Sequence, residues 1–367
     1  MTAQVVRGKK IILFVNSLKT FSWHRRPIAD LLLPENEVIV LSPKPNDTED
    51  FEEVLNKYDV RFLSLSRKGI NPLSELVSIF QIAKIFLKEK PDIVHSFTIK
   101  PVLYSTLASM ALPNSAKMVN SITGLGYAFT KRKEHKILFS IVSTLYYLIL
   151  RFSNAFYIFQ KQEDYDELNK IYPIENYKII PGSGVDTTKF KPSPLPIENN
   201  ILMVSRLIKE KGVLIYLEAL RLLKEEGIPF QAKLIGPIDH DAPNPVSQEE
   251  LDPYINENIV EYIPNSTTIE EEMKWAKIVC YPTYYNEGIP KVFLEAKASG
   301  RLMPNNYELS EKVISFKCTK IPPKELANRI KKLSEVTNEE LIQKEAETIK
   351  NNFSSGQIAL DIALSYA

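Results

Sequence analysis

The sequence predicts an α/β protein of two domains, each built on a doubly wound, mostly parallel β-sheet of the Rossmann-like kind. Two observations predict it. Short apolar runs alternate with stretches of helical periodicity along both halves of the chain, as expected when helices join buried parallel strands. Between the halves, residues 191–196 hold three prolines in six positions, a composition typical of a semi-rigid connector. We therefore expect domains at 1–190 and 197–350, with a ligand site in the cleft between them.

The first half alternates in this way from its start. Residues 10–15, Lys-Ile-Ile-Leu-Phe-Val, are almost continuously apolar, as a strand buried on both faces requires. In residues 72–88 the apolar side chains recur every three or four positions, which is helical spacing. The expected strands are 10–15, 37–41, one around Phe62, 91–95, 117–122, 155–159 and 177–180, and the expected helices are 27–33, 72–88, 103–110 and 137–150.

A second alternation begins directly after the connector. Residues 200–205, Asn-Ile-Leu-Met-Val-Ser, predict a buried strand, and residues 213–225 predict the helix that follows it. Further apolar runs lie at 231–236, 259–263 and 278–281. This half therefore has the pattern of a second Rossmann-like domain, without repeating the first in sequence.

Charge excludes one class of partner and suggests another. The chain has 46 Lys+Arg against 45 Asp+Glu, a formal net charge of +1, whereas a nucleic-acid-binding domain usually has a large basic excess. We expect no nucleic-acid partner. The net value conceals an asymmetry, because residues 1–180 carry six excess positive charges and residues 181–367 five excess negative charges. The first half is therefore suited to anionic lipid or to a diphosphate-bearing molecule.

Neither a metal site nor a membrane-spanning helix is expected. The cysteines, Cys280 and Cys318, lie in or near apolar runs, as reduced and buried thiols do. The four histidines lie far apart and have no metal-binding spacing. No secretory signal is evident, and the longest apolar stretch, 137–150, is too short to span a bilayer comfortably. We expect a cytoplasmic protein.

The most informative window is 285–300, where a strand-end loop leads into a helix. Gly288, Ile289 and Pro290 precede that helix, whose free N–H groups form an anion site. Glu287 lies in the loop and Glu295 about two turns inside the helix, so both carboxylates can contact one ligand at different depths. The alternative is that Glu295 is a solvated helix residue and Glu287 an acid favoured by the helix dipole.

A second window follows the strand at 200–205. Arg206 and Lys211 emerge there at the carboxyl end of the second sheet, where ligands bind in open α/β sheets. Arginine offers a planar fork for phosphate oxygens and lysine a point charge, a combination that suits a diphosphate. The alternative is that both are ordinary surface charges.

Together these motifs resemble the family 4 retaining glycosyltransferases of the GT-B fold. Glu287 and Glu295 match the family's E-x7-E motif, Ser205-Arg206-x4-Lys211-Gly212 matches its basic motif, and Gly184-Val185-Asp186-x3-Phe190 matches its G-V-D-x-x-x-F loop. Residues 24–29 and 122–126 resemble the subgroup that builds bacterial surface glycans on polyprenyl-diphosphate carriers. The resemblance covers nearly the whole chain. It also implies that the last helix, about 353–367, packs back on the first domain.

The resemblance implies roles for the donor-side residues. Arg206 and Lys211 would hold the diphosphate of a nucleotide-sugar and stabilise the departing nucleotide, and Glu287 would contact the transferred sugar, so these three are the expected catalytic residues. Glu295 would bind the ribose hydroxyls. The other expected donor-binding residues are Gly184, Gly288, Ile289 and Pro290. A UDP-sugar is the favoured donor, and no metal is required because the basic side chains can balance the diphosphate.

The acceptor is expected to be a sugar linked to polyprenyl diphosphate at the inner face of the cell membrane. A basic cluster at 130–136 precedes the apolar stretch 137–150, which either contacts anionic lipid or forms a core helix, and the two alternatives are compatible. His95 ends a strand and could instead be buried and hydrogen-bonded. The candidate acceptor-binding residues are His24, Arg25, Arg26, His95, Lys100, Gly124 and Gly126.

Two departures from the family pattern leave alternatives open. Family members often have a glycine-rich loop after the first strand, where this chain has Val15-Asn-Ser-Leu-Lys-Thr20. Beyond Gly300 no strand is evident and no glycine occurs until Gly356, and Glu308 and Glu311 are the two alternatives for the acid that the family has there. The alternatives are a catalytically impaired GT-B scaffold that binds a partner, and a UDP-sugar epimerase of the same fold.

Overall fold

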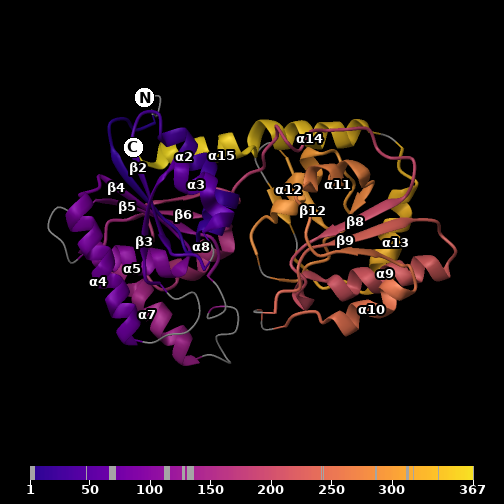
Figure 1. Ribbon diagram of the computed structural model, residues 1–367, viewed down its shortest axis with the longest axis horizontal. Coiled ribbons are helices and arrows are strands. Elements are labelled where there is room, and N and C mark those ends of the chain that lie inside the picture. The colour runs from indigo at the N-terminus through magenta and orange to yellow at the C-terminus, as the bar shows by residue number, and fades with distance from the viewer. Residues whose placement is uncertain are drawn as a thin grey trace. The chain divides into compact units, whose positions relative to one another are not determined.

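The computed structural model divides the chain into two compact units, residues 1–183 with 356–367 and residues 184–355 (Figure 1). The structure describes residues 5–46, 48–65, 72–110, 116–125, 129, 136–240, 242, 244–285, 287–310, 314–316, 318–337 and 339–366. Both units contain a parallel β-sheet with helices on both faces. The predicted α/β class is confirmed.

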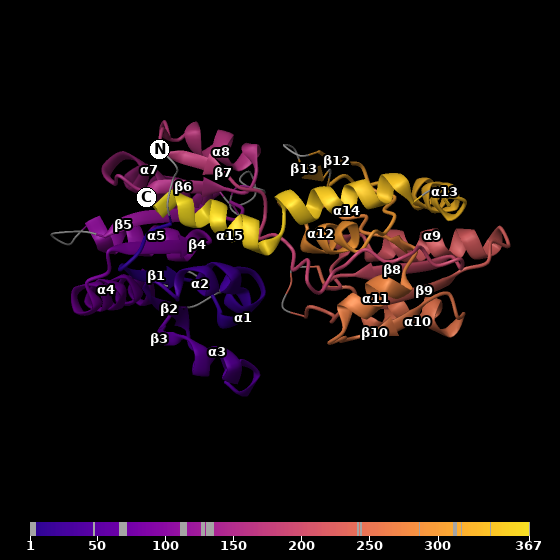
Figure 2. The ribbon, with the colours of Figure 1, turned by 90° about the horizontal axis from the view of Figure 1, so that it is seen from above.

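The first unit contains a seven-stranded sheet of order β3-β2-β1-β4-β5-β6-β7, in which every pairing is parallel (Figure 2). The order reverses between β1 and β4, so a topological switch point lies at their carboxyl ends. The strands are β1 (Lys10–Phe14), β2 (Glu37–Pro43), β3 (Asp59–Leu63), β4 (Ile93–Phe97), β5 (Lys117–Ile122), β6 (Phe156–Phe159) and β7 (Tyr177–Ile179).

Helices cover both faces of this sheet. On one face the core is shared with α4, α5, α7 and α8, and on the other with α1, α2, α3 and α15 (Figure 1). The helices are α1 (Leu18–Thr20), a π-helical turn η1 (Phe21–Arg25), α2 (Arg26–Leu32), a 3₁₀ turn η2 (Glu49–Phe51), α3 (Glu52–Lys57), α4 (Pro72–Glu89), α5 (Ile99–Met110), α7 (Lys136–Phe152), α8 (Gln162–Asn169), α15 (Ser355–Ala363) and a 3₁₀ turn η4 (Leu364–Tyr366).

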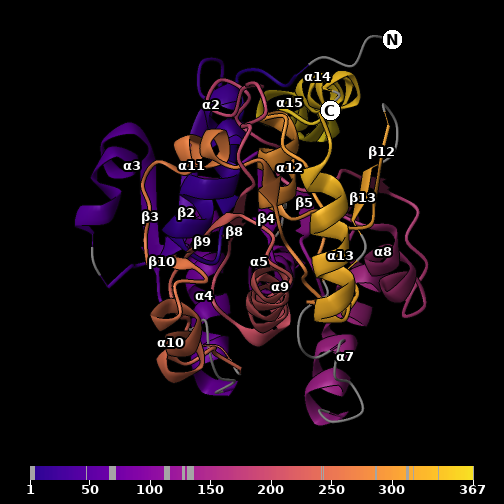
Figure 3. The ribbon, with the colours of Figure 1, turned by 90° about the vertical axis from the view of Figure 1, so that its right-hand side faces the viewer.

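The second unit contains a four-stranded parallel sheet of order β10-β9-β8-β11. Helices α9 and α13 lie on one face, and α11 and α12 on the other (Figure 3). The elements are β8 (Asn200–Val204), a 3₁₀ turn η3 (Lys209–Lys211), α9 (Val213–Glu225), β9 (Gln231–Ile235), α10 (Gln248–Asn256), β10 (Glu261–Ile263), α11 (Ile269–Trp275), β11 (Ile278–Val279), α12 (Lys291–Ala298), α13 (Pro323–Ser334) and α14 (Glu340–Asn352).

The segment beyond Gly300, where no strand was evident from sequence, contains an antiparallel hairpin of β12 (Tyr307–Leu309) and β13 (Ile314–Phe316). A buried polar network ties it to the helices: the Lys297 ammonium donates to the Tyr307 hydroxyl at 2.7 Å and to Glu345 at 2.8 Å. The hairpin is therefore held by tertiary contacts that connect α12 with α14. Over the part of the chain that the structure describes, no helix is both long and apolar enough to cross a membrane.

Candidate active site

Lys211 is held in place by a close approach of two backbone segments in the second unit. It ends the turn η3 that follows β8, and the next residue, Gly212, begins α9 with φ of +80°. A Cβ atom at Gly212 would lie 2.2 Å from the Pro282 carbonyl oxygen, so only glycine fits. The close approach explains why glycine follows Lys211, and it brings Lys211 beside the loop that follows β11.

Hydrogen bonds fasten that loop to the turn. The Glu210 carbonyl accepts from the amides of Tyr284, at 2.9 Å, and Tyr285, at 3.1 Å. It also accepts from the Thr283 hydroxyl at 3.2 Å. Because one carbonyl serves three donors, the loop and the turn are positioned as one piece, and the side chains of Lys211 and Glu287 meet.

Lys211, Glu287 and Tyr281 form a compact triad. The Lys211 ammonium donates to both Glu287 carboxylate oxygens, at 2.6 and 2.7 Å, and to the Tyr281 hydroxyl at 2.6 Å. The Lys211 side chain is 7% exposed and that of Glu287 22%. Tyr285 flanks the triad, with its ring centroid 5.1 Å from the same ammonium.

Burial shifts the pKa values of Lys211 and Tyr281, and the ion pair with Glu287 opposes part of the shift of Lys211. Burial lowers the pKa of the Lys211 ammonium, whereas the charge and hydrogen bonds of Glu287 raise it. Burial, followed by the neighbouring Glu287 charge, raises the pKa of Tyr281 well above its ordinary value. Tyr281 is therefore a neutral hydrogen-bonding group at neutral pH.

Arg206 follows the carboxyl end of β8 and pairs with Asp239. Its guanidinium is 2.6 Å from the carboxylate of Asp239, and the arginine side chain is 55% exposed. The loop that carries Asp239 approaches closely because Gly236 has φ of +138° and its Cβ would lie 1.8 Å from the Ser205 carbonyl oxygen. The positive charge of Arg206 also lowers the pKa of Lys211. Arg206 thus presents an accessible, partly neutralised charge near the triad.

Glu295 lies inside α12, which begins after Pro290. Its side chain is 12% exposed, and Lys291 approaches it at 3.8 Å. Burial raises the pKa of Glu295, against the opposing charge of Lys291. The first N–H groups of α12 have no partner within the helix, so Gly288, Ile289 and Pro290 lead into an anion-favouring helix start. Glu295 is therefore a nearly buried carboxylate and not a solvated one.

Gly184, another predicted donor-side residue, lies against the end of the same unit. A Cβ there would lie 2.8 Å from the Ser354 carbonyl oxygen and from the Ser355 backbone. The neighbouring Val185 amide donates to the Phe353 carbonyl, and the Ser355 amide donates to the Val185 carbonyl. The G-V-D loop is thus positioned by backbone pairing.

Three predicted acceptor-side residues have side-chain partners in the first unit. His24 Nδ1 lies 3.0 Å from the Ser183 hydroxyl. Arg26 pairs with the Glu53 carboxylate, and Lys100 pairs with Glu75 at 2.6 Å. The charges of Arg26 and Lys100 are therefore compensated by carboxylates from distant parts of the sequence.

Two others are buried. His95 is enclosed, with Nδ1 2.7 Å from the Tyr366 hydroxyl and Nε2 2.7 Å from the Ser121 hydroxyl. Arg25 is 4% exposed and lies over the Phe97 ring at 4.6 Å, and burial lowers its pKa to about 10. Burial and the Arg25 charge lower the pKa of His95, so this histidine is neutral at neutral pH.

The remaining acceptor-side predictions divide between described and undescribed residues. Gly124 follows β5 with φ of +133° and nothing near its missing Cβ. Gly126 and most of the basic cluster, residues 130–135, lie outside the described residues. The stretch 137–150 forms most of α7, whose buried face joins the core while Ile137, Ile141 and Tyr147 are exposed.

Four residues that contact the donor-side candidates or their immediate neighbours in sequence were not predicted from the sequence: Gly236, Asp239, Tyr281 and Thr283. Position offered the only signal for them, since Tyr281 ends a strand run and Asp239 follows shortly after another. Their contacts with the segment 205–211 span 31 to 73 residues of sequence, so no local pattern reveals them. Among the described residues, no group of three or more His, Cys, Asp or Glu is placed to hold a metal ion.

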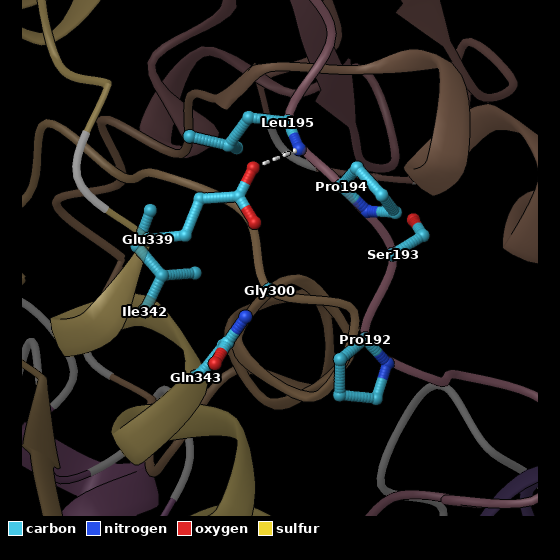
Figure 4. Close-up of a pocket in the computed structure, with 8 residues that line it drawn as sticks. All are labelled: Pro192, Ser193, Pro194, Leu195, Gly300, Glu339, Ile342 and Gln343. Atoms are coloured by element: carbon cyan, nitrogen blue, oxygen red, sulfur yellow. Dashed lines mark hydrogen bonds between the residues drawn. The ribbon is translucent and has the colours of Figure 1, made fainter.

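A pocket elsewhere in the second unit lies beside the proline-rich connector (Figure 4). It has a volume of about 130 Å³, and neither Lys211 nor Glu287 lines it. The Leu195 amide donates to Glu339 at 2.9 Å within it. The lining residues are Pro192, Ser193, Pro194, Leu195, Gly300, Glu339, Ile342 and Gln343. The pocket therefore belongs to the packing of the connector against α14.

Comparison with known proteins supplies the family of each half. Residues 10–161 match the model for glycosyl transferase 4-like domains, and residues 185–352 match that for glycosyl transferases group 1. A Campylobacter jejuni protein, N,N'-diacetylbacillosaminyl-diphospho-undecaprenol alpha-1,3-N-acetylgalactosaminyltransferase, is 26% identical over 76% of this chain and 75% of its own length. The putative colanic acid biosynthesis glycosyltransferase WcaL of Escherichia coli is 28% identical over 49% of this chain and 48% of its own.

Solved structures share the fold. A glycosyltransferase from Rickettsia africae matches with a TM-score of 0.73 at 19% identity, covering 97% of both chains. Anabaena HepE, in complex with UDP and glucose, matches with a TM-score of 0.74 at 18% identity, covering 97% of this chain and 98% of its own. A UDP-N-acetylglucosamine 2-epimerase matches with a TM-score of 0.63 at 13% identity, covering 97% and 95%, which shows a common fold alone.

The family models distinguish a glycosyltransferase from an epimerase of the same fold. Both halves match glycosyltransferase models, and both curated relatives are named as glycosyltransferases, whereas the epimerase likeness is limited to fold. The predicted resemblance is confirmed: the chain is a glycosyltransferase and belongs to the family 4-like glycosyltransferases of the GT-B fold.

Proposed function

We propose that this glycosyltransferase transfers an N-acetylhexosamine or hexose from a UDP-sugar to a polyprenyl-diphosphate-linked sugar, with retention of anomeric configuration, in bacterial surface-glycan synthesis. The observation that carries the donor side is the meeting of Lys211 with Glu287 between the β8 carboxyl end and the α12 amino terminus. The name of the Campylobacter relative, which specifies a diphospho-undecaprenol acceptor, supports the acceptor side.

On the donor side, Arg206 and Lys211 bind the diphosphate and stabilise the negative charge of the departing nucleotide. Arginine and lysine act there by preorganised electrostatics, which is worth most in a water-poor site such as that around Lys211. Glu287 accepts hydrogen bonds from hydroxyls of the transferred sugar. Glu295, at 12% side-chain exposure, receives the ribose hydroxyls.

The backbone supports the same ligand. The N–H groups of Gly288 and Ile289 and the start of α12 face the phosphate with positive potential, and Gly184 contributes through its loop. With two basic side chains and a helix terminus, the charge of the diphosphate is balanced without a divalent ion. Chelator-treated enzyme is therefore expected to keep its activity, and loss of activity that Mg²⁺ or Mn²⁺ restores would contradict metal independence.

On the acceptor side, the first unit supplies apolar and polar surface. His24, Arg26 and Lys100 keep partial exposure and are the proposed contacts for the acceptor. Arg25 and His95 are buried, so they would support the protein structure beneath the acceptor and would not contact the acceptor itself. Gly124, with φ of +133°, would allow the backbone to pass close to the acceptor, and Gly126 is kept as a candidate from sequence alone.

The same unit is proposed to contact the inner face of the membrane. Ile137 on α7 and Phe80 on α4 are 79% and 72% exposed, and each has further exposed apolar side chains on its own helix, Ile141 on α7 and Leu76 and Leu87 on α4. Grouped exposed apolar side chains mark interaction surfaces more often than single ones do. An apolar helix face bordered by basic residues suits an interface with anionic lipid. Such a contact would bring the enzyme to the surface where a polyprenyl-linked acceptor is available.

The decisive experiment is a transfer assay with purified protein, a panel of UDP- and GDP-sugars, and a polyprenyl-diphosphate-linked N-acetylhexosamine in detergent or vesicles. Transfer from a UDP-sugar to the lipid-linked acceptor, with NMR of the product showing the donor's anomeric configuration, supports the proposal. Exclusive use of a GDP-sugar would overturn the donor, and an inverted product would overturn retention.

A further inference from the structure

The Lys211 ammonium has no free hydrogen-bond donor in this structure. An ammonium carries three N–H groups, and three acceptors lie within 2.7 Å of its nitrogen: the Tyr281 hydroxyl and the two oxygens of Glu287. A diphosphate therefore cannot bond to Lys211 until one of these acceptors moves away.

Tyr281 is the acceptor that stays. Its side chain is buried, and its backbone is held on both sides by the Asn305 amide, which donates to the Tyr281 carbonyl at 2.8 Å and accepts from its amide at 3.3 Å. Its hydroxyl lies 3.2 Å from Glu287, so it contacts both charged groups. We assign Tyr281 as a positioning residue that orients the ammonium.

Glu287 is the acceptor that can leave. Its side chain is three times as exposed as that of Lys211, at 22% against 7%, and it lies in the loop before α12. Besides Lys211, its neighbours are two hydroxyls, from Tyr281 at 3.2 Å and Thr283 at 3.4 Å. Charge-assisted bonds are stronger than those to neutral hydroxyls, so the carboxylate stays with Lys211 until another anion replaces it.

We propose that Glu287 is an internal counter-ion that the donor exchanges for its own diphosphate, and that this exchange lets the site distinguish a whole nucleotide-sugar from the spent nucleotide. The inference rests on the proposed function. When a nucleotide-sugar binds, its phosphates take over Lys211 while its sugar hydroxyls offer new donors to the released Glu287. When UDP alone binds, Glu287 is released without a replacement donor, which costs free energy because a partly buried carboxylate loses its strongest partner.

The consequence is that Glu287 weakens the binding of UDP while it strengthens the binding of the sugar-bearing donor. After transfer, the carboxylate returns to Lys211 and helps to expel the UDP product. Removing the charge of Glu287 while keeping the shape of its side chain separates the effect on UDP binding from the effect on nucleotide-sugar binding. Glu287→Gln leaves Lys211 available to phosphate and should bind UDP more tightly than the wild type, by about tenfold for one charge-assisted hydrogen bond.

The test is a calorimetric double-mutant cycle on the full chain, with UDP as the first probe and UDP-N-acetylglucosamine as the second. The variants are wild type, Glu287→Gln, Lys211→Met, the double variant, and Glu261→Gln. Glu261 is an exposed carboxylate in β10 of the same unit, so its variant controls for a change of one charge. Circular dichroism and thermal unfolding confirm that each variant is folded.

If the exchange occurs, Glu287→Gln increases the affinity for UDP only in the protein that keeps Lys211. In the Lys211→Met background the gain should vanish, since no ammonium remains to be released, and Glu261→Gln should bind as wild type. A gain that persists with Lys211→Met would show simple charge repulsion and overturn the exchange. A ratio of UDP to UDP-N-acetylglucosamine affinity that is unchanged by Glu287→Gln would overturn the claimed discrimination.

Failure of the proposed function gives a different pattern. If Lys211→Met weakens UDP binding but Glu287→Gln does not tighten it, the donor site stands and the exchange is wrong. If wild type and every variant fail to bind both probes, the UDP donor is wrong, and the exchange falls with it.

Discussion

Gly212→Ala tests whether the close approach behind Lys211 holds the site together. The substitution has two costs in the second unit. A non-glycine residue at φ of +80° is disfavoured by about 1–2 kcal/mol. The added Cβ would also lie 2.2 Å from the Pro282 carbonyl oxygen, and relieving such an overlap in packed structure costs about 1–3 kcal/mol more. We expect the free energy of unfolding of this unit to fall by about 2–5 kcal/mol in total.

A second glycine of the same unit separates the two costs. Gly227 has φ of +70°, and nothing lies within 4 Å of its missing Cβ. Gly227→Ala should therefore lose only the conformational part, about 1–2 kcal/mol. The difference between the two variants measures the clash with the loop. Because that loop must move by about 1 Å to clear the Cβ, donor turnover should fall tenfold to a hundredfold in Gly212→Ala alone.

The assay is denaturant unfolding followed by the fluorescence of Trp275, which lies in the second unit. The chain has two tryptophans, so the variants are made in a Trp23→Phe background to keep the signal from one unit. Linear extrapolation gives the free energies, and turnover is measured in parallel. The reasoning is refuted if Gly212→Ala loses no more stability than Gly227→Ala, or if it keeps full turnover.

Three further predictions follow from the same structure. Lys211→Ala and Glu295→Ala should each lower nucleotide-sugar affinity or turnover by about tenfold or more, and full activity in both would contradict the donor site. Burial raises the pKa of Asp164 to about 6, above its value in the unfolded chain, so the folded state binds the proton more tightly. This group therefore favours folding below about pH 4, and its contribution is lost as the pH rises through 6. Between pH 5 and 7.5, the free energy of unfolding of the first unit should therefore fall by about 1–3 kcal/mol less in Asp164→Asn than in the wild type. An unchanged pH profile in chemical denaturation would contradict this. Ile137→Asp should reduce cosedimentation with anionic vesicles without changing donor affinity, and equal vesicle binding would contradict a lipid contact through α7.

Local pattern predicted most of the sheets because each buried strand is a short apolar run. The run 10–15 became β1 at Lys10–Phe14, and the run 200–205 became β8 at Asn200–Val204. The hairpin β12–β13 was not predicted because its stability comes from elsewhere. Its Tyr307 is held by Lys297 and Glu345, which lie 10 and 38 residues away in the sequence, and such pairing leaves no local periodicity.

The side-chain contacts of the donor-side candidates were easier to anticipate from sequence than those of the acceptor-side candidates, for a related reason. Lys211 and Glu287 belong to windows with a strand, a turn and a helix start, so chemistry and local structure pointed to the same residues. Arg26 and Lys100 also lie at predicted helix starts, yet the sequence did not reveal their ion pairs with Glu53 and Glu75, which lie 27 and 25 residues away. The sequence therefore indicated the local setting of these charged residues but not their long-range ion pairs, and the acceptor roles of Arg26 and Lys100 stay predictions.

Neutralisation by these ion pairs changes the meaning of the first half's positive excess. Two sequence segments, 66–71 and 130–136, together hold six Lys or Arg and one Glu, and so account for five of the six excess positive charges in residues 1–180. The first directly precedes α4 in sequence, and the second runs into the start of α7. Along the exposed side of α4, the described side chains include Leu76, Phe80 and Leu87 together with Lys84 and Lys88. In the sequence, basic charge is therefore concentrated directly before α4 and α7, two helices with exposed apolar side chains. That combination suits anionic lipid, and binding of a soluble diphosphate does not require it.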